Sequence, residues 1–176
     1  MKPYYYLIVF LVFNTTLISC ASDDDLNFNS EYKTSFKSWL TFKNESANTY
    51  KYVVGGGSVF TDYSWETTIT VTNGMVTQRD FSYVGGSPNT LPEDQKQWSE
   101  TETTLNTHED TPAAATLTLD EIYTKAVQKW LVKQKGFTSY FEAKNNGLIS
   151  LAGYVEDNCA DDCFIGVRIL SITALD

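Results

Sequence analysis

The sequence predicts an α+β domain of two layers, in which a curved antiparallel sheet carries two helices on one face. Two segments with apolar side chains at helical spacing predict the helices. Each is followed by short segments of alternating polarity with Asn-Gly turns, which are typical of antiparallel hairpins. The length of 176 residues and the 42% of hydrophobic residues suit one such domain behind a short leader.

The first half is predicted to be a helix followed by three strands. The helix covers about residues 30–43, and strands are expected over 50–54, 65–71 and 75–83. Asn73-Gly74 predicts a type I′ turn between the second and third strands. Arg79 and Asp80 interrupt the alternation of the third strand, which indicates a bulge or an edge position.

The segment at about 85–117 differs in composition from the rest. It contains Pro88, Pro92 and Pro112 among many Thr, Glu and Asn residues, which predicts a long surface loop. Trp98 and Leu105 are the side chains expected to attach this loop to the body.

The second half repeats the layout of a helix and three strands. Thr118 and Glu121 have the spacing of a capping box, and an apolar stripe follows until Gly136 ends the helix. Strands are expected over 137–143, 148–155 and 164–172, with a turn at Asn145-Asn146-Gly147. Trp39 and Trp130 lie on the two helical stripes and are predicted to be core residues. The two halves indicate a possible α-βββ internal repeat.

The first residues have the pattern of a secretory signal. Lys2 precedes an apolar run from Tyr4 to Phe13, which is too short to cross a bilayer as a helix. Leu17-Ile18-Ser19-Cys20 closes it and resembles the lipobox of bacterial lipoproteins. The resemblance implies a signal peptide over 1–19, lipidation of Cys20 and a lipid anchor in a membrane. The alternative is an ordinary signal peptide cut after Ala21, which would give a secreted protein.

The residues after the lipobox are acidic. Ala21 to Asp25 resembles the surface-export signal of Bacteroidota lipoproteins, so the resemblance implies an outer-membrane or cell-surface location. We expect residues 20–29 to be an acidic tether and 30–176 a single α+β domain. In layout alone, that domain resembles small uncharacterised α+β domains of bacterial lipoproteins, and its helix-on-sheet packing is similar to cystatin-like or PepSY-like domains. No functional residue carries over from this likeness.

Cys159 and Cys163 are the two cysteines left when Cys20 is lipidated or removed. An even pair in an exported domain predicts a disulfide. The ring that it closes is small, so the chain-entropy model gives a stabilisation of about 2 kcal/mol.

Around this pair lies the densest acidic cluster of the chain. Oxygen ligands at Asp157, Asn158, Asp161 and Asp162 are candidates for binding Ca²⁺, although their spacing fits no EF-hand loop. The alternative is a charged hairpin end in contact with water. No other cofactor is expected.

Aromatic side chains on the predicted strands form a second candidate site. Tyr50, Tyr52 and Trp65 could line a platform for a sugar or an apolar ligand. The alternative is that they are core residues beneath a helix. His108 is the single histidine, and it is interpreted either as an exposed loop residue or as a general base beside Glu109.

The net charge of −9 argues against a nucleic-acid partner, because few cations are available for phosphates. No nucleophile with an adjacent base and no metal-ligand pattern is found in the sequence. These observations favour an exported, membrane-anchored lipoprotein whose domain binds a ligand, a protein or a glycan without catalysis. The alternatives are a cell-surface hydrolase that uses a carboxylate pair, and an inhibitor module that presents the 85–117 loop to another protein.

Overall fold

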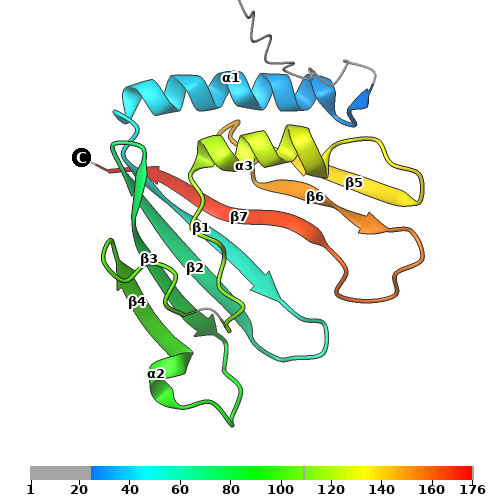
Figure 1. The fold of residues 1–176 in the computed structure, drawn as a ribbon. Coiled ribbons are helices and arrows are strands. Elements are labelled where there is room, and N and C mark those ends of the chain that lie inside the picture. Colours follow the sequence, from blue (N-terminus) through cyan, green and yellow to red (C-terminus); the bar gives the residue numbers. More distant parts are fainter. Residues whose placement is uncertain (1–24, 109, 176) are drawn as a thin grey trace, which may run out of the picture.

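The computed structural model describes residues 25–108 and 110–175, so the predicted signal peptide and Cys20 lie outside the described residues. The protein has a curved, seven-stranded antiparallel sheet with the strand order β4-β3-β2-β1-β7-β6-β5 (Figure 1). The strands are β1 (Tyr50–Gly57), β2 (Ser64–Thr72), β3 (Met75–Val84), β4 (Gln97–Thr101), β5 (Phe137–Glu142), β6 (Leu151–Glu156) and β7 (Ile165–Ala174). This sheet, with helices on one face, is the predicted α+β fold.

The two halves of the chain have the predicted common layout. Helix α1 (Asn29–Glu45) precedes β1, β2 and β3, and helix α3 (Leu119–Lys125) precedes β5, β6 and β7. The halves meet where β1 pairs with β7, with Tyr50 opposite Ala174 and Tyr52 opposite Ile172. The additional strand β4 extends the first half at the sheet edge.

The core lies between the sheet and the two helices. Tyr123 of α3 is fully buried, and its hydroxyl lies 2.7 Å from Ser35 Oγ of α1. The indole of Trp39 is also fully buried and donates to Asp120 Oδ1 at 3.0 Å, which joins α1 to the first turn of α3. Trp39 and Trp130 are both buried, as their positions on the helical stripes predict. The two helices therefore pack on each other as well as on the sheet (Figure 1).

Local signals in the sequence form the expected structures. Asn73 and Gly74 have φ values of 52° and 81°, the positive angles that a type I′ turn requires. The capping box of Thr118 and Glu121 is present at the start of α3.

A bulge is present between β2 and β3, but the register shift lies between Thr70 and Val71 and not at Arg79 and Asp80, where the sequence predicted it. Arg79 and Asp80 pair regularly with Ile69 and Thr68, and β3 is not an edge strand because β4 pairs with it.

The helix that begins at Leu119 ends earlier than the sequence predicts. After Lys125 it continues as one π-helical turn, Ala126–Trp130, in which the Leu131 N–H donates to the Ala126 carbonyl at 2.9 Å. The chain then leaves the helix because its backbone pairs with the N-terminal segment: Asn27 N–H donates to Leu131 O at 2.7 Å. Residues 25–28 are therefore part of the domain, and the predicted acidic tether is shorter than 20–29.

The 85–117 segment is more ordered than the predicted long loop. It contains the short helix α2 (Glu93–Lys96) and strand β4, which pairs with β3. Glu100 of β4 is fully buried and accepts hydrogen bonds from Arg79 at 2.9 Å and from the backbone N–H groups of Asn106 and His108 at 2.8 Å. Because the inward-facing residue Glu100 is charged, β4 lacks the alternation of polar and apolar residues by which a strand is recognised in a sequence.

Candidate functional site

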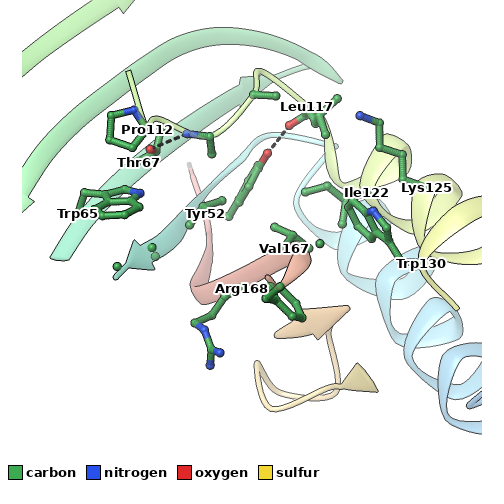
Figure 2. Close-up of a pocket in the computed structure, with 18 of the residues that line it drawn as sticks. Tyr52, Trp65, Thr67, Pro112, Leu117, Ile122, Lys125, Trp130, Val167 and Arg168 are labelled. Carbon is green, nitrogen blue, oxygen red and sulfur yellow. Dashed lines mark hydrogen bonds between the residues drawn. The ribbon is translucent and has the colours of Figure 1, made fainter. Parts of the chain in front are cut away.

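A pocket of about 710 Å³ opens between the inner face of the sheet and helix α3 (Figure 2). Its walls come from five parts of the chain: the end of β1, the first half of β2, the connection from β6 into the start of β7, the helix with its π-helical turn, and the segment that leads into α3. The side chains that line it include Tyr52, Val54, Trp65, Thr67, Pro112, Ala114, Ala115, Leu117, Ile122, Lys125, Trp130, Asp162, Phe164 and Val167. Most of them are apolar or aromatic, as in small-molecule sites.

The floor of the pocket is formed by the glycine run at the end of β1. Gly56 lies opposite Trp65 on β2, and a Cβ atom added at Gly56 would overlap the indole Nε1 of Trp65. Glycine is therefore required for the indole to lie across β1. A Cβ atom added at Gly57 would lie 3.5 Å from the Cβ of Ser64, which is an ordinary contact. Gly56 thus makes room for the indole of Trp65 at the pocket floor.

The helical wall contains Ile122, Lys125 and Trp130 (Figure 2). Trp130 is the last residue of the π-helical turn, which widens the helix and changes the direction of the side chains that follow. Such turns are frequent at functional sites. Lys125 is half-buried and extends toward the side of Leu117 (Figure 2).

The segment that leads into α3 is bonded to the sheet. The hydroxyl of Tyr52 donates to the Leu117 carbonyl, and the Ala114 N–H donates to Thr67 Oγ1 at 2.9 Å (Figure 2). Burial raises the pKa of Tyr52, and the nearby Tyr50 and Glu121 raise it further, so the Tyr52 hydroxyl remains a neutral donor. This wall is therefore a fixed part of the pocket.

The connection between β6 and β7 closes the other end. Asp162 accepts hydrogen bonds from the Ser58 hydroxyl and from the Val59 N–H, the latter at 3.2 Å, so this connection is joined to the β1–β2 turn. Cys159 and Cys163 lie in it at disulfide-bonding distance, with 6.2 Å between their Cα atoms.

The structure separates the aromatic residues that the sequence groups together. Tyr52 and Trp65 both line the pocket. Tyr50 does not line this pocket: it is fully buried, and its hydroxyl accepts from the Leu119 N–H at 2.9 Å. Its position beneath the start of α3 corresponds to the alternative that placed it in the core.

Two of the four calcium candidates, Asp157 and Asp162, are bonded to different parts of the chain. Asp157 accepts from the Thr138 hydroxyl at 2.8 Å, whereas Asp162 is bonded to the β1–β2 turn. Among the residues that the structure describes, no three His, Cys, Asp or Glu side chains are grouped as a metal site would need. Both carboxylates instead join neighbouring loops and strands.

His108 has a different partner from the one considered in the sequence. Its Nδ1 lies 2.9 Å from Glu100 Oε1, and its ring stacks on Trp98 with 4.1 Å between ring centroids. Glu109 lies outside the described residues. His108 therefore attaches the 102–116 segment to the sheet, because it contacts the buried Glu100 and Trp98 together.

The described residues that line the pocket do not provide the pair of carboxyl groups that a glycosidase uses. A glycosidase needs two carboxyl groups on opposite sides of its substrate. Asp162 is the one carboxylate among the described residues that line the pocket, and it is bonded to Ser58 and Val59.

Comparisons with models of protein families, with curated proteins and with solved structures found no match for this chain. Within residues 25–108 and 110–175, no helix has the length and apolar character needed to cross a membrane.

The pocket as a whole was not visible in the sequence. Its helical wall depends on the π-helical turn, and its second wall comes from a segment that reads as a loop. Lys125 appears in the sequence only as a polar residue beside the apolar stripe. Besides the aromatic residues Tyr52 and Trp65, the Gly55-Gly56-Gly57 run was a signal in the sequence for this part of the pocket.

Proposed function

We propose that this protein is an exported lipoprotein, anchored through Cys20, whose α+β domain binds a small, largely apolar molecule without catalysis. One observation carries the binding proposal: the aromatic pocket between the sheet and α3. Its volume falls within the range of about 300–1,000 Å³ that is usual for small-molecule sites.

The construction of the walls supports binding of a ligand rather than presentation of a loop. An inhibitor module would need the 85–117 segment free to contact another protein. Here Arg79 and Glu100 hold this segment to the sheet, and Ala114 and Leu117 in it form a wall of the pocket. A fixed wall costs little ordering entropy when a ligand binds.

A neutral fluorescent probe tests the pocket directly. N-phenyl-1-naphthylamine is apolar and uncharged, and it fluoresces strongly when it leaves water. We expect saturable binding at one site. Ala115→Phe adds a ring at the pocket wall and should weaken binding at least fivefold, whereas Ala113→Phe, two residues earlier and outside the lining, should leave it unchanged. Equal binding by both variants, or no saturation, would contradict the proposal.

The anchor is tested separately at the N-terminus. We expect mass spectrometry of the natural product to show a chain that begins at Cys20 with diacylglycerol attached, and globomycin to block this processing. Cys20→Ala should move the protein to the soluble fraction. A mature chain that begins after Ala21 without acyl mass would support secretion instead.

The cysteine pair belongs to the same proposal. In exported protein we expect no free thiol at Cys159 or Cys163 under denaturing conditions without reductant. Titration of both thiols under those conditions would show that the bond does not form.

A further inference from the structure

The polar side chains of the pocket fall into two groups. In the first group the protein itself supplies the partner: Tyr52 donates to Leu117, Thr67 accepts from Ala114, and Asp162 accepts from the β1–β2 turn. These groups hold the walls together.

The second group consists of donors. No hydrogen bond or ion pair joins the ammonium group of Lys125, or the indole N–H of Trp65 or Trp130, to another residue that the structure describes. All three side chains line the pocket (Figure 2). Ammonium and indole N–H groups donate hydrogen bonds and cannot accept them. A ligand that satisfies these groups must supply acceptor atoms.

Lys125 adds a charge to this arrangement. It is half-buried on α3 among apolar lining residues, between Ile122 and Trp130 in the sequence. The other cation at the pocket, Arg168, extends from β7 away from Tyr52 and Trp65 (Figure 2). Because the whole chain has a net charge of −9, it repels anions in general. A cation inside the apolar pocket is therefore a local feature that favours a ligand with its own negative group.

We propose that the ligand is an amphipathic anion, with an apolar body against Trp65, Trp130 and Val167 and one acidic group at Lys125. This inference rests on the proposed ligand-binding function. A charge-assisted N⁺–H···O⁻ hydrogen bond would hold the acidic group, and such bonds are roughly twice as strong as neutral ones. The aromatic surface would hold the apolar body.

Decanoate and 1-decanol provide matched probes, since they share a chain length and differ in charge. Each is titrated against bound N-phenyl-1-naphthylamine at pH 8 and low salt. We expect decanoate to displace the probe about tenfold more effectively than 1-decanol, as one additional charge-assisted hydrogen bond predicts. Added salt should reduce this difference.

Variants of the helix identify the cation. Lys125→Gln should lower the affinity for decanoate about tenfold and leave that for 1-decanol unchanged, while Lys125→Arg should retain most of the preference. Lys129→Gln is the matched control, because Lys129 is an exposed cation on the following turn and does not line the pocket. It should behave as the wild type.

The outcomes separate the two proposals. Equal displacement by decanoate and 1-decanol, no displacement by decanoate, or equal losses in the Lys125→Gln and Lys129→Gln variants would overturn the anion inference. In each of these cases the ligand site itself would still be supported if N-phenyl-1-naphthylamine binds and Ala115→Phe weakens that binding. Failure of N-phenyl-1-naphthylamine itself to bind would overturn the proposed function.

Discussion

Single residues decide the shape of the pocket, and Gly56 shows this most clearly. At the pocket floor, the indole of Trp65 lies where a side chain of residue 56 would be. A neighbouring glycine, Gly57, has room for a methyl group. Two adjacent glycines of the same strand therefore have different roles.

Gly56→Ala should displace Trp65 and weaken binding of N-phenyl-1-naphthylamine at least fivefold. The new Cβ would overlap the indole Nε1, so the ring must leave the floor. Gly57→Ala is the matched control, with an expected change of less than twofold. Fluorescence titration measures both, and equal affinities would show that Trp65 is not positioned by Gly56.

Glu100 is the second residue on which the site depends. Burial by itself would raise the pKa of this carboxyl, but hydrogen bonds from Arg79, His108 and Asn106 outweigh burial and hold the pKa well below its ordinary value. The ionised form therefore stabilises the folded state. This contribution is complete above the ordinary glutamate pKa of about 4.3 and is lost as the pH falls below it.

Glu100→Gln should lower the free energy of unfolding at pH 7 by about 3 kcal/mol, because it leaves the buried Arg79 without its counter-charge. It should also flatten the loss of stability between about pH 5 and pH 2, since a titrating group is removed. Urea denaturation at several pH values tests both effects. Glu93→Gln, whose side chain is 88% exposed, should change neither. An unchanged acid profile in Glu100→Gln would contradict the assignment.

Among the elements, helix α3 and its π-helical turn contribute most to the site. The capping box starts the helix at Leu119, and the π-helical turn ends it at Trp130. The first of these signals is local in sequence and was predictable. The second was not, because the backbone pairing of residues 25–27 with 131–133 joins distant parts of the chain.

Thr118→Ala should destabilise the domain by about 1 kcal/mol, the usual cost of removing an N-cap side chain. The Thr118 hydroxyl accepts from the Glu121 N–H, which would lose its partner. Thr124→Ala is the control, since Thr124 is exposed on the same helix and caps nothing. Thermal unfolding of the two variants gives the comparison, and equal midpoints would contradict a capping role.

The strands also divide into those that local sequence signals predict and one that depends on contacts between distant residues. Alternation and Asn-Gly turns predicted every strand except β4 to within a few residues, because these signals depend on neighbouring positions. Strand β4 was missed because its inward positions hold Trp98 and Glu100, and the charge becomes acceptable only when Arg79 lies opposite. The candidate site was half predictable: Trp65 and Tyr52 were identified, whereas Lys125 and Trp130 required the fold.

At the scale of the whole molecule, the proposed anchor and the proposed ligand site lie in different parts of the chain. The N-terminal end, where the predicted lipid anchor lies in the sequence, leads into α1, while the pocket opens between the sheet and α3. A negatively charged body on an acyl anchor should be repelled by anionic lipid headgroups.

The chain offers a direct measurement of ligand position, because it has only four tryptophans and each indole N–H gives one NMR signal. Trp65 and Trp130 line the pocket, whereas Trp39 and Trp98 are buried elsewhere. Titration of ¹⁵N-labelled protein with decanoate should shift the indole signals of Trp65 and Trp130 and leave those of Trp39 and Trp98 in place. Unchanged signals from Trp65 and Trp130, or equal shifts in all four, would contradict a ligand site between the sheet and α3.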